Sequence, residues 1–438
     1  MARKLPESLT LSLDTIVGGG QTLGTLDDGR KCFVWGGLPG ETVTIRPTKV
    51  KSSYVEGVVT DVLKSSPERI TPRDTDSYLS TSPWQIMSFT AEQNYKSKLI
   101  SEAFALHHIE LPTSPEIYSD QQTYNYRNKI EFSWYSDLDP ISGVDTLDIA
   151  FFRRGSKGKI PVEGTSLAHP NINTLALEIR DLLRSKSISA RQLKTLLIRC
   201  DQSGDSVWQL YTKDKLPNLI SPDEASKLTA SGGEIIYSDP RSPASRITER
   251  IAKFGETVLR DEIFGIEFRY PAESFFQINL PIYQQVLADM REFIEPDKPV
   301  IDLYSGVGTI GLTVSQPNQS LKLIEINQSA VSEMKENIAK IGRQNAEAIL
   351  SASENVTDLI DSESTIIVDP PRAGLHSNVT NRLLETSPSS IIYLSCNPVT
   401  QARDVELLSS KYEITYMRGY NFFPRTPHIE NLVVLRLK

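Results

Sequence analysis

The last third of the chain alternates short apolar runs with amphipathic stretches. The apolar runs are PVIDLYS, LKLIEIN, STIIVD and SIIYLSC, and one of the stretches between them is QSAVSEMKENIAKIG. Strands that are apolar throughout are buried on both faces, and intervening helices supply the crossovers that parallel strands need. Apolar side chains at helical spacing also predict a helix over residues 281–295. The pattern therefore predicts an α/β fold with a doubly wound parallel sheet over residues 273–438, closed by a final hairpin from KYEITYMRGY and ENLVVLRLK.

The composition is that of an ordinary globular protein of roughly three domains. Of the 438 residues, 39% are hydrophobic and 23% are charged, and the formal net charge is −8. This charge argues against a uniformly basic nucleic-acid binder but allows a local basic face. No apolar run approaches the ~20 residues of a membrane span, and MARKLPESLT lacks the apolar segment of a secretory signal. We therefore expect a cytoplasmic protein without a membrane partner.

Residues 1–70 predict a small closed β-barrel. Turns rich in glycine, namely GGG, DDG and LPG, separate short runs of β-forming residues. A basic hairpin in this part could follow a phosphate backbone, or it could be a solvated turn. The β-forming runs are residues 31–35, 41–46 and 54–62, and the basic residues are Arg46, Lys49 and Lys51.

Residues 71–272 predict a central α+β domain that follows a linker at residues 66–74. It begins with a helix near residues 91–109, which could pack on the catalytic part of the chain. FFRRGSKGKI sets basic residues beside aromatic ones, which is the combination that stacking and phosphate contacts with RNA require. An ordinary charged hairpin loop is the alternative. The residues concerned are Phe151, Phe152, Arg153, Arg154, Lys157 and Lys159.

A glycine-rich loop follows the first strand of the predicted sheet. VIDLYSGVGTIGL contains Gly-x-Gly-x-x-Gly over residues 306–311, beginning at Gly306, and Glu325 closes the next strand. Such glycines let the backbone approach a ligand, and the acid can accept hydrogen bonds from ribose hydroxyls. The pattern fits a dinucleotide or S-adenosylmethionine. DLYS favours S-adenosylmethionine, because Asp302 and Tyr304 can line a pocket for a nucleoside joined to an amino acid.

Two further strand ends carry candidate functional residues. Asp369 begins DPPRAGL, where Arg372 replaces the aromatic residue that is common in methylases of exocyclic amines. Cys396 ends the next apolar run, in SCNP. Ligands bind beyond the carboxyl ends of strands in open α/β sheets, so we expect Glu325, Asp369 and Cys396 to converge on one crevice. Beside a crevice thiol, Glu430 becomes a candidate proton acceptor.

A thiol, a carboxylate and a cofactor pocket are what methylation of uracil at C5 needs. Addition of a thiolate to C6 makes C5 nucleophilic, so that C5 can attack the methyl group of S-adenosylmethionine. A base then removes the C5 proton, and the thiol leaves. The thiolate is the reactive form, and a polar, electropositive setting would lower the pKa of the cysteine.

These motifs resemble those of the RNA uracil-5-methyltransferase family. SFFQINLPIYQQVL, IDLYSGVGTIGL, DPPRAGL, SCNPVTQARD and FFPRTPHIENLVVLRL occur in the family's order, and GGGQTLGTLDDGRKCFVWGGLPGETV resembles the TRAM RNA-binding barrel of its ribosomal-RNA members. The resemblance implies a class I Rossmann-like, S-adenosylmethionine-dependent methyltransferase domain, with Cys396 as nucleophile and Glu430 as proton acceptor. It also implies a target uridine flipped out of its RNA fold. The implied cofactor-binding residues are Gln277, Tyr304, Gly306, Thr309 (Asn in many relatives), Glu325 and Asp369.

The resemblance also bears on the partner and on metals. We expect a structured RNA, with 23S ribosomal RNA ahead of transfer RNA because bacterial transfer-RNA enzymes of the family generally lack the barrel. PRDTDSYLSTSPWQIMSF holds serines and threonines where relatives carry iron–sulfur cysteines, and Cys32, Cys200 and Cys396 have no metal-ligand spacing, so no metal and no cluster are expected. We also expect a monomer. A nicotinamide-dependent oxidoreductase and a non-catalytic RNA-binding factor are the alternatives.

Overall fold

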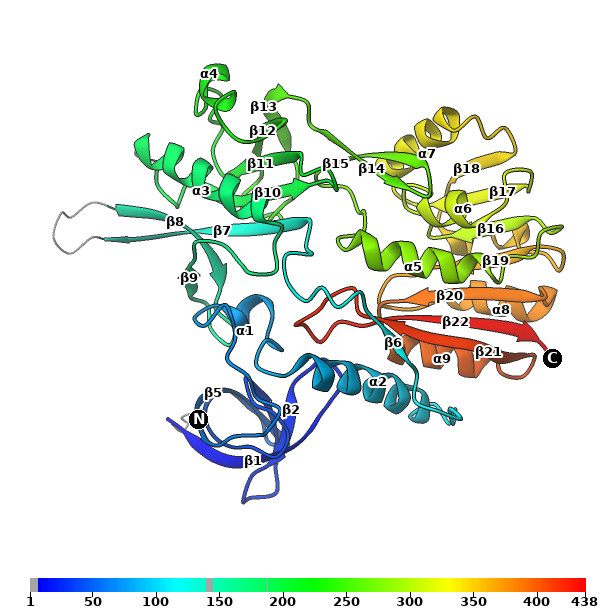
Figure 1. Cartoon of the computed structure of the whole chain (residues 1–438), viewed down its shortest axis with the longest axis horizontal. Coiled ribbons are helices and arrows are strands. Elements are labelled where there is room, and N and C mark those ends of the chain that lie inside the picture. The colour runs from blue at the N-terminus through cyan, green and yellow to red at the C-terminus, as the bar shows by residue number, and fades with distance from the viewer. Residues whose placement is uncertain (1–6, 139–144, 187) are drawn as a thin grey trace.

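The computed structural model describes residues 7–138, 145–186 and 188–438. Figure 1 shows a small barrel, a sheet with flanking helices in the middle of the chain, and a second, larger sheet at the C-terminal end. No helix in the described ranges has the length and apolarity that crossing a membrane would take. The closed barrel and the sheet topology confirm the predicted α/β class with an N-terminal barrel.

The N-terminal barrel is closed, with strand order β1-β2-β3-β5-β4. Its inward-facing side chains, among them Leu13, Val34 and Ile45, form a separate apolar core. The three predicted β-forming runs are strands, and two further strands precede them. The strands are β1 (Leu9–Ile16), β2 (Thr22–Thr25), β3 (Lys31–Trp35), β4 (Thr42–Val50) and β5 (Tyr54–Lys64).

The segment predicted as a linker is held against the barrel. The carboxylate of Glu41 is fully buried and accepts hydrogen bonds from the backbone N–H of Leu38 and Ser66. It also forms an ion pair with Arg69, which donates to the carbonyl of Gly36. A buried carboxylate needs such partners, so these contacts tie residues 66–69 to the barrel wall. The interpretation as a free linker was wrong there.

The middle of the chain forms a seven-stranded sheet of order β13-β12-β11-β10-β7-β8-β9, covered by α3, and a separate two-stranded ladder β14-β15. The strands are β7 (Lys129–Leu138), β8 (Asp145–Phe152), β9 (Lys159–Pro161), β10 (Leu193–Cys200), β11 (Ser206–Thr212), β12 (Gly232–Tyr237), β13 (Glu249–Gly255), β14 (Val258–Ile263) and β15 (Ile266–Pro271). The helices are α1 (Tyr78–Thr81), α3 (Pro170–Ser185) and α4 (Pro222–Ala225).

The C-terminal sheet has eight strands in the order β18-β17-β16-β19-β20-β22-β21-β6. The five strands from β18 to β20 pair in parallel, and β22 and β21 close the sheet as the predicted antiparallel hairpin. The strands are β6 (Ile117–Tyr118), β16 (Val300–Leu303), β17 (Leu321–Glu325), β18 (Ala346–Leu350), β19 (Thr365–Val368), β20 (Ser390–Ser395), β21 (Tyr412–Tyr420) and β22 (Glu430–Leu437).

Two apolar cores cover the two faces of this sheet. Successive residues of a strand face opposite sides, so Ile391 belongs to the core beneath α2, α8 and α9, and Ile392 to the core beneath α5, α6 and α7. The predicted helix at 281–295 is α5, which ends at Arg291. The helices and short 3₁₀ turns are α2 (Phe89–Ala105), α5 (Leu280–Arg291), α6 (Thr309–Val314), α7 (Gln328–Lys340), η1 (Ser353–Asn355), η2 (Thr357–Leu359), α8 (Ser377–Thr386) and α9 (Pro398–Leu408).

Helix α2 lies early in the chain but packs against α9 of the C-terminal sheet. Ser88 begins it by accepting a hydrogen bond from the backbone N–H of Ala91, and the chain turns away after Ala105, reaching a positive φ of 58° at His108. The helix is therefore displaced from the predicted 91–109. The division of the chain at residues 70 and 272 stays a prediction, and α2 and β6 lie with the C-terminal sheet although both precede residue 272.

Candidate active site

The glycine-rich loop turns sharply between β16 and α6. Tyr304, Gly306 and Gly308 all have positive φ, at 64°, 56° and 86°. For tyrosine this conformation is strained, and such strain is typical of functional sites. A Cβ on Gly311 would lie 2.5 Å from Leu323 Cδ2, so only glycine lets α6 pack this closely on the sheet.

Asp302 supports this loop from below. Its side chain is fully buried, and its Oδ2 accepts a hydrogen bond of 2.8 Å from the backbone N–H of Gly311. Burial raises the pKa of Asp302 to about 8. Asp302 is not among the residues that line the cavity described below, so the prediction that it lines the pocket was wrong, whereas Tyr304 does line it.

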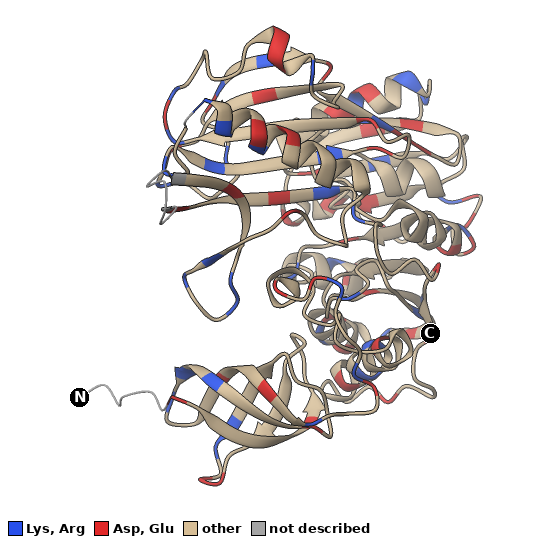
Figure 2. Ribbon diagram, turned by 60° about the vertical axis from the view of Figure 1, so that its left-hand side comes forward, with Lys and Arg blue, Asp and Glu red and all other residues tan. Residues whose placement is uncertain are grey.

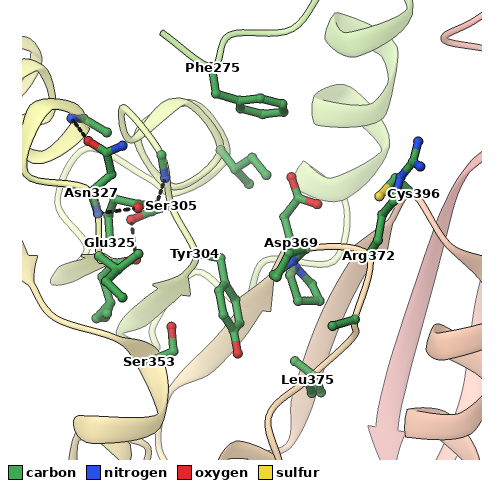
Figure 3. Close-up of a pocket in the computed structure, with 18 of the residues that line it drawn as sticks. Phe275, Tyr304, Ser305, Glu325, Asn327, Ser353, Asp369, Arg372, Leu375 and Cys396 are labelled. Carbon is green, nitrogen blue, oxygen red and sulfur yellow. Dashed lines mark hydrogen bonds between the residues drawn. The ribbon is translucent and has the colours of Figure 1, made fainter. Parts of the chain in front are cut away.

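Glu325 is held at the end of β17 with its carboxylate beside the loop. One oxygen accepts a hydrogen bond of 3.0 Å from the backbone N–H of Gly306, and the other accepts one of 2.7 Å from that of Asn327. Figure 3 shows these contacts on one side of the cavity, with Tyr304 between Glu325 and Asp369. The hydrogen bonds orient the carboxylate and leave lone pairs for a ligand.

The DPPR and SCNP motifs are joined to each other. Asn397 begins α9 by accepting a hydrogen bond from the backbone N–H of Val399, and Pro398 occupies the first helical position, where its missing N–H is not needed. The side chains of Asn397 and Thr400 both donate to the backbone carbonyl of Arg372, at 2.9 and 3.2 Å. The loop after β19 is therefore fixed to the turn that carries the thiol.

The strand register brings Cys396 and Glu430 together. Strands β20 and β22 are antiparallel and their last pair is Ser395 opposite Asn431, so Cys396 directly follows one member of this pair and Glu430 directly precedes the other. Opposed residues of an antiparallel pair point to the same face, with Cα atoms about 4.5–5.5 Å apart. Two residues that are distant in sequence thus become neighbours at one edge of the sheet.

Burial and neighbouring acids raise the pKa values of all three groups at this edge. The pKa of Cys396 rises to about 11 because of burial and the nearby Glu430 and Asp369, although the guanidinium of Arg372 acts in the opposite direction. Burial likewise raises the pKa of Asp369 to about 7 and that of Glu430 well above its usual range. The structure does not provide the electropositive setting that would lower the pKa of the cysteine, because the thiol is buried and meets two carboxyl groups and a single guanidinium.

The eight residues that the sequence analysis assigned to catalysis and cofactor binding all line one cavity of about 1130 Å³. Pockets for a single small ligand measure about 300–1,000 Å³, so this one has room for a cofactor and a base. Figure 3 shows Asp369 near the middle of the cavity and Cys396 to its right, with Arg372 beside the sulfur. The eight residues are Gln277, Tyr304, Gly306, Thr309, Glu325, Asp369, Cys396 and Glu430.

The sequence profile of the tRNA (uracil-5-)-methyltransferase family matches residues 89–438 of this chain. The chain belongs to this family. The resemblance seen in the motifs is confirmed, and the chain is an S-adenosylmethionine-dependent RNA (uracil-5-)methyltransferase. The oxidoreductase and the non-catalytic RNA-binding factor are set aside.

The similar proteins span almost the whole chain. An RNA methyltransferase of uncharacterized function from Enterococcus faecalis is 29% identical over 92% of each chain, and one from Aquifex aeolicus is 28% identical over 98% of this chain and 99% of its own. Among solved structures, the tRNA (uracil-54, C5)-methyltransferase of Pyrococcus abyssi in complex with S-adenosyl-L-homocysteine has a TM-score of 0.79. It is 22% identical, and the match covers 98% of this chain and all of that one. The fold of the methyltransferase, barrel included, is therefore shared with that enzyme.

The sequence analysis missed residues that hold one wall of the methyltransferase cavity. Phe275 is 76% exposed and lines the cavity next to Gln277. Arg199, fully buried in β10, donates to the backbone carbonyls of Ser274 and Phe276, at 2.8 and 2.6 Å. An arginine within the apolar run LLIRC was the available signal, because a charged residue inside a buried strand needs specific partners.

The basic residues predicted to contact RNA divide into two groups. Lys49 pairs with Glu56, the Arg154 guanidinium stacks on Trp35 at 4.1 Å, and Lys159 donates to the carbonyl of Trp134. Figure 2 shows the loop between β8 and β9 reaching toward the barrel, where a Cβ on Gly155 would lie 2.7 Å from Thr48 Cγ2. These contacts dock the loop on the barrel. The remaining basic residues, Arg46, Lys51, Arg153 and Lys157, are exposed, and their contact with RNA stays a prediction.

Within the described parts of the chain, no group of three or more His, Cys, Asp or Glu side chains is arranged to hold a metal ion. Cys32 and Cys200 are buried and free, and Cys396 is partly exposed. The expected absence of an iron–sulfur cluster stays a prediction.

Proposed function

We propose that this methyltransferase modifies C5 of a uridine in structured RNA, with Cys396 as nucleophile and Glu430 as proton acceptor. The observation that supports the proposal is the pairing of β20 with β22, which ends next to Cys396 and Glu430, and both of these residues line one cavity. Binding alone needs neither group. Their pairing fits a reaction that adds a nucleophile to the base and later removes a proton from it.

The other half of the cavity suits S-adenosylmethionine. A Cβ on Gly306 would meet no atom within 4 Å, so the loop borders open space, and Glu325 is oriented there by two backbone N–H groups. Glu325 can accept hydrogen bonds from ribose hydroxyls, and the Asp369 carboxylate is available to a cationic amine or sulfonium. When bound, S-adenosylmethionine supplies the methyl group. We propose Gln277, Tyr304, Gly306, Thr309, Glu325 and Asp369 as its contacts.

The side chains at the edge of the sheet would act in order. The Cys396 sulfur forms a bond to C6 of uracil, and the electron pair of the C5–C6 double bond becomes an enolate that is nucleophilic at C5. Arg372 favours the thiolate over the thiol. After C5 has gained the methyl group, Glu430 takes the C5 proton, the double bond re-forms, and the bond from sulfur to C6 breaks. A carboxyl group with a raised pKa is a strong base once it is ionised, which suits this step.

We propose 23S ribosomal RNA as the substrate, and transfer RNA is the second candidate. The resemblance of the barrel to that of ribosomal-RNA members supports the first candidate, and the fold shared with a transfer-RNA enzyme over 98% of the chain, barrel included, supports the second. The discriminating experiment maps 5-methyluridine in both RNAs after the gene is deleted and restored. Loss of the base from 23S RNA alone supports the first candidate, and loss from transfer RNA alone supports the second.

We further propose that the enzyme acts as a monomer. All eight candidate residues come from one chain, so the cavity is complete without a second copy. Sedimentation at working concentrations tests this, and an obligate dimer would contradict it.

The reaction is tested with two variants. Cys396→Ala should abolish methylation and keep binding of S-adenosyl-L-homocysteine, because the thiol acts on the base. Glu430→Gln should allow attack and methyl transfer but slow release, so that a protein–RNA adduct persists in denaturing electrophoresis. Cys32→Ala is the matched control, since Cys32 is buried in the barrel away from the cavity. Unchanged turnover of Cys396→Ala, or full activity without adduct in Glu430→Gln, would contradict the proposed roles.

A further inference from the structure

A buried ion pair lies on α2, outside the cavity. Lys96 and Glu92 are one helical turn apart, both side chains are 0% exposed, and their nitrogen and oxygen lie 3.2 Å apart. Neither residue lines the cavity. A buried ion pair contributes little net stability, since the desolvation of two charges offsets their attraction. A contribution to net stability therefore does not explain why the fold buries this ion pair.

Both members of the pair bind the segment that leads to Glu430. Lys96 Nζ donates to Asn421 Oδ1 at 2.6 Å and to the carbonyl of Phe423 at 3.1 Å. Glu92 accepts from Asn421 Nδ2 at 2.8 Å and from the backbone N–H of Arg425 at 3.0 Å. Four hydrogen bonds to two charged side chains therefore hold residues 421–425 against α2.

The bound segment has a backbone that needs support. Arg425 has a φ of 66°, in the left-handed region that a non-glycine residue rarely occupies. Its guanidinium donates to the carbonyl of Met87, just before α2. Strained conformations persist only where their surroundings over-determine them, and the contacts from α2 do so here.

The barrel encloses the same segment from the other side. A Cβ on Gly20 would lie 2.2 Å from Pro427 Cβ, so the backbone of the glycine loop packs directly on Pro427. Trp84 joins the two, because its indole N–H donates to the carbonyl of Gly20 and its backbone N–H to that of Arg425. Residues 421–427 thus have polar partners on α2 and a close steric neighbour in the barrel.

We propose that Glu92 and Lys96 are positioning residues for Glu430. Buried charged groups that are fully paired can select one conformation among several of similar packing. Here the selected conformation is the path of residues 421–429 that starts β22 in register and sets Glu430 at the same edge of the sheet as Cys396. The inference rests on the proposed function, since it assigns the pair to the proton-removal step.

The test uses the full-length enzyme with target RNA that carries tritium at C5 of uridine. Tritium release reports proton removal, and denaturing electrophoresis reports the covalent adduct. Lys96→Met and the double variant Glu92→Gln with Lys96→Met remove one or both charges at nearly constant volume. We expect tritium release per folded enzyme to slow at least about tenfold while adduct formation changes less than about threefold, so that adduct accumulates. Lys98→Met is the matched control, because Lys98 lies on the same helix, half exposed, and its partners are Glu102 at 3.6 Å and Thr15 at 3.0 Å, neither of which belongs to residues 421–427.

Folding is measured separately by thermal unfolding and by binding of S-adenosyl-L-homocysteine. Asn421→Ala removes the side chain that binds both Glu92 and Lys96, and it leaves α2 itself unchanged. It is assessed by the same ratio of adduct to released tritium, so a folding defect in the α2 variants does not decide the outcome. If the pair has a purely structural role, the variants should lose adduct formation and tritium release in proportion, and that result would overturn the proposal. A ratio of adduct to released tritium equal to that of the wild-type enzyme would also overturn it. If wild type makes no 5-methyluridine, or Glu430→Gln traps no adduct, the proposed function fails instead.

Discussion

Arg372 is the group that favours ionisation of the cysteine in the cavity. Burial, Glu430 and Asp369 raise the pKa of Cys396 to about 11, and the charge and hydrogen bond of Arg372 act in the lowering direction. The side chain of Arg372 is exposed and also lies 3.5 Å from Nδ1 of His428. Replacing it by glutamine keeps the backbone carbonyl that Asn397 binds and removes both the charge and the hydrogen bond of the guanidinium. The change should therefore raise the pKa of the thiol further.

Typical energies of an exposed ion pair and of a charged hydrogen bond set the expected rise in the pKa of Cys396. With a pKa of about 11, on the order of one thiol in 3,000 is ionised at about pH 7.5. An exposed ion pair contributes up to about 1 kcal/mol, and a hydrogen bond to a charged group about 1.5–3 kcal/mol. Because Arg372 is exposed, we take about 1.4 kcal/mol, which equals one pKa unit and a tenfold loss of thiolate.

The assay follows formation of the covalent adduct in the Glu430→Gln background, between about pH 7 and 9. Below the pKa of the thiol, the rate should rise about tenfold per pH unit, since the thiolate fraction does. Arg372→Gln should give a parallel line about tenfold lower, so that one additional pH unit restores the rate. Arg403→Gln is the matched control, because Arg403 lines the same cavity but its guanidinium binds Asp404 and the carbonyl of Ala373.

Two results would refute this reasoning. A rate that does not change with pH would mean that thiolate formation does not limit attack. A loss in Arg372→Gln that higher pH does not restore would mean that Arg372 acts on the RNA and leaves the thiol unaffected.

Two further predictions concern the glycine loop. Gly311→Ala should lower the free energy of unfolding by about 1–3 kcal/mol, measured with urea, because the new Cβ would lie 2.5 Å from Leu323 Cδ2; unchanged stability would show that the loop relaxes freely. Glu325→Ala should weaken binding of S-adenosyl-L-homocysteine at least about tenfold in calorimetry, since Gly306 and Asn327 then lose the carboxylate that joins them. Wild-type affinity would remove Glu325 from the proposed cofactor contacts.

The parallel sheet and its strand ends could be predicted because their signals are local. Apolar runs and helical stretches alternate along the chain, and the carboxyl ends of parallel strands meet at one edge. The sequence therefore predicts that Glu325, Asp369 and Cys396 share one crevice, and in the structure they line one cavity. Helix ends were less accurate, because α2 starts at the cap formed by Ser88 and stops where tertiary packing turns the chain.

The remaining features depend on contacts between distant segments, which no local pattern encodes. The meeting of Cys396 and Glu430 at one edge of the sheet follows from the pairing of β20 with β22, and the segment that leads into β22 is held by Glu92 and Lys96, more than 320 residues earlier. The raised pKa of the thiol likewise reflects which charges the fold gathers around it. Electrostatics and steric fit act through space. The motifs therefore indicate which side chains react, but the distances between these side chains, their ionisation and the contacts that hold them are set only when the chain has folded.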